Sequence, residues 1–179
     1  AVTFLGILTC AFVSDVQSEK CLPEDIGIMK NFQPEEFFIG TWYVTHAERN
    51  GKDATVCHKY KTNKERNGKF SFDYGYYNNG KEDPFIQVHC EETKKENSEF
   101  SFNCKPKQES SQIQPYNVDL TFITTDYRDH AMLYRCGPID DGFTNNTLVL
   151  HRRKEDENNL LIEGFFHRSQ SNCRDTSDF

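Results

Sequence analysis

The feature that most constrains this chain is an alternation of apolar and polar residues with a period of two. In segment 70–76 every even-numbered residue is aromatic, and the residues between them are small or polar. In segment 116–122 the even-numbered residues are again aromatic or aliphatic, with asparagine, aspartate and threonine between them. Successive side chains of a β-strand point to opposite faces, so this pattern is typical of antiparallel strands with one buried face.

Strand-like segments of this kind recur along the chain and are separated by turn residues. Eight are found, at 42–47, 55–62, 69–77, 85–90, 99–105, 116–125, 130–136 and 146–153. Asn-Gly or Asp-Gly dipeptides at 50–51, 67–68, 79–80 and 141–142 favour tight hairpin turns. Eight short strands at regular spacing predict an all-β domain, either a sandwich or an antiparallel up-and-down β-barrel.

Two short helices are expected beside the strands. Pro34 followed by two glutamates is typical of a helix N-terminus, and this segment stops at Gly40. Between 161 and 166 apolar residues recur at a spacing of four, which predicts a short C-terminal helix packed on the outside of the sheet. There is no internal repeat, linker or change of composition after residue 19, so we expect residues 19–179 to form a single domain.

The first residues differ in composition from the rest of the chain. Residues 1–13 contain no charge, and this run is shorter than the about 20 apolar residues of a membrane-spanning helix. It is typical of the apolar region of a secretory signal, and the small residues Val16 and Ser18 predict cleavage after Ser18. We expect residues 1–18 to be an N-terminally incomplete signal peptide and the mature protein to be secreted and extracellular.

The cysteine count agrees with secretion. Of the seven cysteines, Cys10 lies in the expected signal, and the remaining six can pair in 15 ways. Cys90 and Cys104 end two short strand-like runs around a polar segment, so a cross-strand bridge is expected there. A zinc site is not expected, because there is no paired Cys-x-x-Cys and no matching histidine pair. A glycosylation sequon at Asn145 is consistent with a secreted protein.

Charge and motifs argue against several classes of function. The chain carries 21 Lys and Arg against 28 Asp and Glu, a net charge of −7, and has no basic block for nucleic-acid binding. No nucleophile-elbow motif occurs, the cysteines are expected in bridges, and the acidic residues lie in hydrophilic runs. We therefore predict that the protein is not an enzyme and takes neither nucleic acid nor a membrane as partner. We also expect a monomer.

Three short motifs then carry a family resemblance. Gly40-Thr41-Trp42 follows the first predicted helix, Thr125-Asp126-Tyr127 precedes the seventh strand-like run, and Arg152-Arg153 ends the eighth. In this order, over about 110 residues, they resemble the motifs of lipocalins. More narrowly, the chain resembles salivary lipocalins of blood-feeding triatomine bugs, the pallidipin, triabin, procalin and nitrophorin group. The resemblance implies a closed eight-stranded barrel that holds one small ligand.

The resemblance also implies roles for particular residues. Arg152 or Arg153 is expected to stack on Trp42 at the closed end of the barrel. The family pattern implies disulfides Cys21–Cys136 and Cys57–Cys173, with Cys90–Cys104 as the third. Strand parity then gives the residues expected to face the ligand, with His46 as a polar contact: Val44, His46, Phe72, Tyr74, Tyr76, Tyr116, Val118, Leu120, Met132, Tyr134, Leu148 and Leu150.

The expected ligand is a small host mediator whose capture counters haemostasis, platelet aggregation or inflammation. An eicosanoid is preferred, because the inward set is apolar and rich in tyrosine; a biogenic amine comes next. A shift of parity by one residue would instead bring Asp73 or Asp119 inside. The alternative function is inhibition of thrombin or another host protease by the outer surface, on which acidic clusters are expected at 91–92, 140–141 and 155–157.

Haem is not expected as a cofactor. Nitrophorin-like relatives hold haem through a histidine on the fourth strand, and Tyr76 stands at the matching position here. None of the six histidines lies in that segment. A phenol binds ferric iron well only as phenolate, and its reference pKa is about 10. The resemblance to nitrophorins alone would suggest nitric oxide carriage, but without the histidine we predict neither haem binding nor nitric oxide carriage.

Overall fold

The computed structural model describes residues 22–23, 25–49, 52–54, 58–77, 85–108, 113–139 and 142–153. Within these ranges the side chains at 48–49, 52–54, 58, 76–77, 138–139 and 142–145 are outside the description, among them Tyr76 and Asn145. The predicted signal segment 1–18, the predicted C-terminal helix and Cys21, Cys57 and Cys173 also lie outside it. No helix among the described residues is long and apolar enough to cross a membrane.

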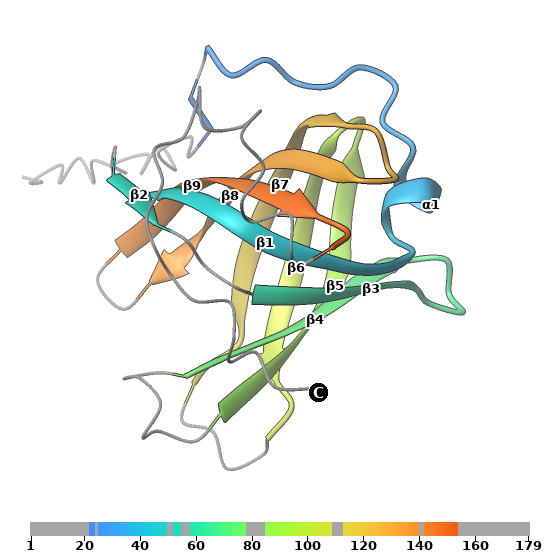
Figure 1. The fold of residues 1–179 in the computed structure, drawn as a ribbon. Helices are drawn as coiled ribbons and strands as arrows, with labels where there is room; N and C mark the ends of the chain where they lie inside the picture. Colours follow the sequence, from blue (N-terminus) through green and yellow to red (C-terminus); the bar gives the residue numbers. More distant parts are fainter. Residues whose placement is uncertain are drawn as a thin grey trace, which may run out of the picture.

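The strands form one antiparallel sheet that closes on itself (Figure 1). Neighbouring strands follow the chain order from β3 to β9, and an additional pairing of β1 with β9 completes the ring. The short β2 pairs only with β1, so β1 and β3–β9 make an eight-stranded closed barrel and confirm the predicted fold. The strands are β1 (Gly40–Arg49), β2 (Lys52–Ala54), β3 (His58–Lys64), β4 (Phe70–Tyr77), β5 (Phe85–Glu96), β6 (Glu99–Pro106), β7 (Tyr116–Thr125), β8 (His130–Ile139) and β9 (Gly142–His151).

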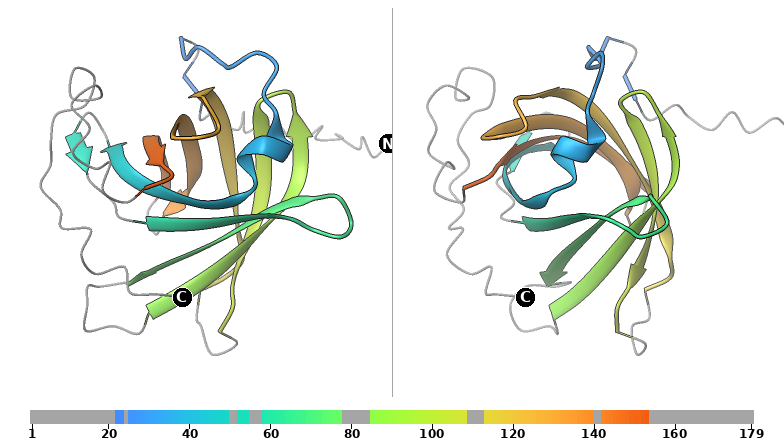
Figure 2. Two further views of the ribbon diagram at one scale, coloured as in Figure 1. Left: turned by 45° about the vertical axis from the view of Figure 1, so that its right-hand side comes forward. Right: turned by 90° about the vertical axis from the view of Figure 1, so that its right-hand side faces the viewer.

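A short helix, α1 (Pro34–Phe37), lies across one end of the barrel (Figure 2, right). Pro34 opens it, two glutamates occupy its first turn, and Phe37 is buried. Below α1 the barrel is filled by aromatic rings: Phe37 stacks on Trp42 at 4.9 Å and Phe38 stacks on Phe70 at 4.8 Å between ring centres. We call this the closed end and the opposite end, where β7 begins, the far end.

Cross-strand pairs identify the inner face, because directly opposite residues share a face. Phe122 pairs with Leu133, and Leu133 pairs with Leu148. All three belong to the hydrophobic core cluster. The same cluster contains seven of the residues predicted to face inward, and Tyr116 packs against it; the seven are Val44, Phe72, Tyr74, Val118, Leu120, Leu148 and Leu150.

Candidate ligand-binding site

The three sequence motifs meet at the closed end. The guanidinium carbon of Arg152 lies 3.6 Å from the ring centre of Trp42, and the Trp42 indole donates a hydrogen bond to the Phe37 carbonyl at 2.9 Å. Arg152 Nη1 also donates to the carbonyls of Ile39 at 2.5 Å and Thr41 at 3.2 Å. Burial lowers the pKa of Arg152 to about 10, so it keeps its charge at neutral pH. This arrangement is structural and stabilises the closed end.

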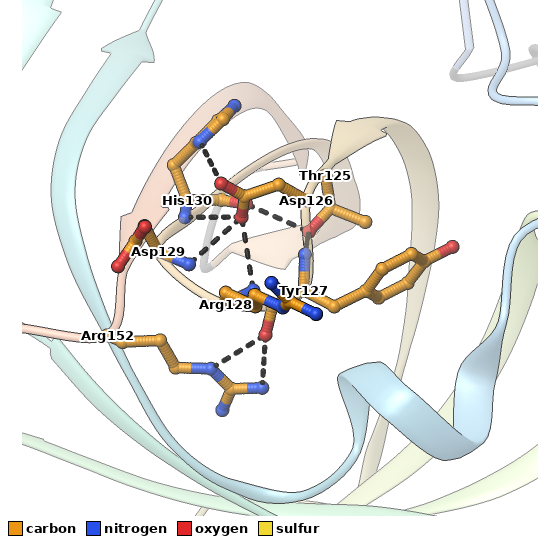
Figure 3. Close-up of polar contacts among 7 residues, drawn as sticks. All are labelled: Thr125, Asp126, Tyr127, Arg128, Asp129, His130 and Arg152. Carbon is orange, nitrogen blue, oxygen red and sulfur yellow. Dashed lines mark hydrogen bonds and ion pairs between the residues drawn. The ribbon is translucent and has the colours of Figure 1, made fainter.

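The Thr125-Asp126-Tyr127 motif forms the turn between β7 and β8 (Figure 3). Asp126 Oδ1 accepts hydrogen bonds from the backbone N–H groups of Arg128, Asp129 and His130, at 3.1, 2.9 and 3.0 Å. Tyr127 has a φ of 64°, in the left-handed region, and its carbonyl accepts from Arg152 Nε at 3.3 Å. The turn therefore docks onto the arginine of the closed end.

The prediction that His46 faces inward is wrong, and a β-bulge is the reason. Val44 pairs with Leu150 and His46 with Val149, so the register shifts by one residue at Thr45. Extra residues of this kind reverse the parity of the strand beyond them. The Thr45 hydroxyl lies 3.0 Å from His46 Nδ1 and 2.7 Å from His151 Nδ1, in a buried polar cluster on the outer side.

The inward parity predicted for the seventh strand-like run is also wrong. Met132 pairs with Thr124 and Tyr134 with Thr121, on the face opposite to Phe122 and Leu133. The inner positions of β8 are Ala131, Leu133, Arg135 and Gly137. Because every residue of this run except Arg135 is apolar, aromatic, histidine or cysteine, its alternation was too weak to fix the face.

Arg135 is therefore a functional candidate that sequence reasoning missed. It pairs with Leu120 of β7 and with Asn146 of β9, and Leu120 is in the core cluster. Two residues further on, Gly137 leaves room beside it. A Cβ at Gly137 would lie 3.4 Å from Arg135 Nη2 and 3.1 Å from Val118 Cγ2. The guanidinium thus lies along the inner wall, in the half of the barrel nearer the far end.

Phenol groups from three strands share this half of the interior. The hydroxyls of Tyr74 on β4 and Tyr116 on β7 are hydrogen-bonded to each other. Tyr60 on β3 lies 5.7 Å from Tyr74 between ring centres. Burial raises the pKa of Tyr60 to about 12, and the nearby charge of Arg135 opposes this rise. Since β8 and β3 are separated by β9 and β1 in the ring, the arginine acts across the barrel.

The carboxylates of Asp73 and Asp119 point away from Arg135 and the tyrosines. Asp73 lies on the outer face of β4, where its two oxygens are 2.7 Å from His89 Nδ1 and 2.7 Å from Lys107 Nζ. Asp119 is exposed and pairs with Cys136, on the face opposite to Leu120. Among the described residues, Glu92 has the one carboxylate on the inner face, and it lies towards the closed end. This carboxylate accepts a hydrogen bond from the backbone N–H of Phe70 at 3.1 Å.

The burial of Glu92 also corrects one of the acidic clusters expected on the outer surface. Glu92 is 7% exposed, and its neighbour Glu91 forms an ion pair with Lys69 at 2.8 Å. The clusters expected at 140–141 and 155–157 lie outside the described residues. Among the residues that are described, no group of three or more His, Cys, Asp or Glu side chains could hold a metal ion.

The structure describes three of the six cysteines expected in the mature protein. Cys90 on β5 and Cys104 on β6 are directly opposite each other and form a disulfide that is fully buried on the inner face. Cys136 is disulfide-bonded as well, on the outer face of β8. Its expected partner Cys21, and the expected pair Cys57–Cys173, lie outside the described residues and stay predictions.

Comparison with known proteins agrees with this fold. The Triabin family model matches residues 15–160. Triafestin-1 of Triatoma infestans is 33% identical over 174 residues, which cover 91% of this chain and 82% of that protein. A solved structure of a protein in complex with leukotriene C4 is 27% identical, with a TM-score of 0.51, over 70% of this chain and 73% of the other.

A more distant solved structure resembles the fold alone. The tryptamine complex of the amine-binding protein of Rhodnius prolixus is 19% identical, with a TM-score of 0.57, over 73% of each chain. The family match, the barrel topology and the closed-end motifs agree with one another. The chain is a member of the Triabin family and has the lipocalin fold.

Proposed function

We propose that this protein is a secreted salivary lipocalin, without enzymatic activity, that sequesters an eicosanoid of the host inside its barrel. The observation that carries the proposal is the inner-face position of Arg135 among the phenols of Tyr60, Tyr74 and Tyr116. An eicosanoid joins an apolar chain to a carboxylate. An arginine is the cation best suited to a carboxylate, since its planar fork donates two parallel hydrogen bonds.

The rest of the inner wall suits the apolar chain. Between the tyrosines and the closed end the barrel presents apolar and aromatic side chains such as Phe72, Phe102 and Leu120. Burying the hydrocarbon chain against them supplies affinity, at about 25 cal/mol for each Å² removed from water. The leukotriene C4 complex of the relative at 27% identity supports the same ligand class.

A biogenic amine is the weaker candidate. A protonated amine would need a carboxylate nearby, and Asp73 and Asp119 both lie on the outer face. Glu92 is on the inner face but near the closed end, with one oxygen bonded to the Phe70 backbone. The positive charge of Arg135 would also repel an ammonium group. The proposed capture of an eicosanoid therefore rests on the positive charge of Arg135.

Arachidonate and its methyl ester provide the test. We expect the wild-type protein to bind arachidonate at least about tenfold more tightly than the ester, a difference of about 1.4 kcal/mol. Arg135→Gln should abolish this preference by weakening binding of the acid alone, because the ester carries no charge. Arg66→Gln removes the same charge from the exposed turn at the closed end and should leave both affinities unchanged. Titration calorimetry measures both ligands.

Two results would contradict the proposal. If native mass spectrometry shows that the protein retains tryptamine but not arachidonate, the ligand is an amine and not a carboxylate. If micromolar protein inhibits thrombin-induced clotting and binds neither ligand, the alternative of a protease inhibitor would be favoured. That alternative would need the outer surface, to which the buried Glu92 does not contribute.

A further inference from the structure

A row of charged residues crosses the outer face of four neighbouring strands. Lys61 on β3 pairs with Asp73 on β4, Asp73 with His89 on β5, and His89 with Lys105 on β6. Each is next in sequence to an inner-face residue, so all four lie on the outer face. Strands β3–β6 lie side by side along one wall of the barrel (Figure 2).

Two more lysines extend the row along the strand direction. Lys59 is two residues before Lys61 on the same face of β3. Lys107 follows the end of β6, where its backbone N–H donates to the Gln87 carbonyl at 2.8 Å and its Nζ lies 2.7 Å from Asp73 Oδ2. We name this group the outer basic patch; it consists of Lys59, Lys61, Asp73, His89, Lys105 and Lys107.

The patch opposes the charge of the whole molecule. It contains four lysines and one aspartate, which forms an ion pair with Lys107, whereas the chain as a whole carries a net charge of −7. In the sequence these lysines lie in two separate segments, 59–61 and 105–107, and neither is a basic block. The barrel brings the two segments onto one wall, so the local positive charge arises from strand order.

The dimensions of the patch decide what it fits. Strands lie about 4.8 Å apart and same-face neighbours along a strand about 6.8 Å apart, so the lysine pairs form a grid of roughly 14 by 7 Å. A single small anion cannot contact both pairs at once, whereas a linear polyanion laid across the strands can. Glu91 and Glu65 flank the row on the closed-end side, where a flat anionic membrane would have to face them.

We propose that the outer basic patch binds a linear sulfated polysaccharide that runs across β3–β6. Sulfate esters stay ionised at all physiological pH values and recur along such a chain, so several can pair with the lysines simultaneously. The binding energy is then mainly electrostatic and falls steeply with salt, as in other complexes with polyanions. The patch is on the outer face of the barrel wall and the ligand site is on the inner face, so the two ligands would bind independently.

Heparin is the probe that tests the proposal. At pH 7.4 and low salt we expect the wild-type protein to be retained on immobilised heparin despite its net negative charge. The variant Lys105→Gln/Lys107→Gln should bind at least tenfold more weakly, with a smaller slope of log Kd against log salt. The control Lys94→Gln/Lys95→Gln changes the same charge on exposed residues of β5 near the closed end, and should stay within twofold of wild type.

Several outcomes would overturn the proposal. Flow-through of the wild-type protein, equal loss in both double variants, or equal binding to desulfated heparin would each show that the patch does not recognise sulfate. Binding to phosphatidylserine vesicles without binding to heparin would assign the patch to a membrane instead. Unchanged melting temperatures of both variants establish that the differences do not come from unfolding.

Discussion

At the scale of single residues, Arg135 gives the far half of the interior a positive charge. Arg135 faces inward on β8, where its charge opposes the rise in pKa that burial gives to the Tyr60 hydroxyl. A guanidinium at such a position can pair with a carboxylate in a site that excludes much of the water, which strengthens the interaction. We therefore propose that this single residue sets the charge preference of the barrel.

Gly137 lies beside the Arg135 guanidinium and provides a residue-scale prediction. A methyl group there would lie 3.1 Å from Val118 Cγ2, which must give way by a few tenths of an ångström, and would be in van der Waals contact with Arg135 Nη2 at 3.4 Å. This contact narrows the range of positions open to the guanidinium. We expect Gly137→Ala to weaken arachidonate binding by up to about tenfold, or about 1.4 kcal/mol, with little change for the methyl ester. Calorimetric titration of both ligands measures the effect.

Gly27 offers the control for this substitution. A Cβ at Gly27 would meet no atom within 4 Å, so Gly27→Ala should bind both ligands as the wild type does. Equal affinity of Gly137→Ala and wild type for arachidonate would contradict the expected effect of the methyl group on the guanidinium.

At the scale of elements, irregular positions determine which side chains meet. The bulge at Thr45 turns His46 outward and Ala47 inward, and the turn between β7 and β8 holds Tyr127 in a left-handed conformation. In that turn the Asp126 carboxylate caps three backbone N–H groups and lies 3.0 Å from His130 Nδ1 through its other oxygen. The Tyr127 carbonyl of this turn accepts a hydrogen bond from Arg152.

The Asp126 turn is expected to contribute stability that depends on pH. Partial burial raises the pKa of Asp126, but the backbone hydrogen bonds from Asp129 and His130, together with the other contributions, lower it below its ordinary value. The folded state therefore prefers the carboxylate. Its contribution is complete above the unfolded-state pKa of about 4 and is lost as the pH falls through the lower folded-state pKa.

Asp126→Asn tests this contribution. We expect a loss of about 1 kcal/mol at pH 7, seen as a melting temperature about 2–4 °C lower, because a neutral amide accepts more weakly than a carboxylate. The difference from wild type should shrink below pH 4. Thermal melts of both proteins between pH 3 and 7 measure it.

The neighbouring acid supplies the comparison. Asp129 contributes its backbone N–H and carbonyl to the turn, and Asp129→Asn keeps both. This variant should melt close to wild type at every pH. If the difference in melting temperature between Asp126→Asn and wild type stays constant down to pH 3, the charge of the Asp126 carboxylate does not contribute to stability.

At the scale of the whole molecule, closure of the sheet creates two separate environments. The inner wall combines apolar side chains with Arg135 and the tyrosines, and the outer wall gathers lysines from β3 and β6. The closed end is fixed by α1, Trp42 and Arg152. The proposed lipid anion inside and the proposed polyanion outside would therefore not compete for the same surface.

The interior environment also bears on haem, which we propose the barrel does not carry. Tyr74 on β4 is hydrogen-bonded to Tyr116, and His46, His89, His130 and His151 are not among the inner-face positions of their strands. A phenol would have to lose its proton to bind iron well. Titration with hemin should therefore give no sharp, stoichiometric Soret band. A stoichiometric band that disappears in Tyr76→Phe would contradict this and make Tyr76 the ligand.

The sequence by itself determined the parts of the fold that depend on local pattern. Strict alternation around Phe72 and Val118 was enough to orient β4 and β7, because one face of each strand is apolar and the other polar. The spacing of the Gly40, Asp126 and Arg152 motifs was enough to predict a lipocalin. The pair Cys90 and Cys104 could be predicted because the two cysteines flank one short hairpin.

Only the tertiary structure decided the facing of residues whose local pattern is ambiguous. His46 lies beyond a bulge, and a bulge is produced by pairing with β9, about a hundred residues away in the chain. In β8 both faces are apolar or aromatic near Met132 and Tyr134, so pairing with β7 fixed the register and brought Arg135 inside. The outer basic patch likewise exists only because closure of the sheet places residues 59–61 and 105–107 on one wall. In each case the deciding interaction joins strands that are distant in sequence, and a periodic pattern within one strand carries no information about it.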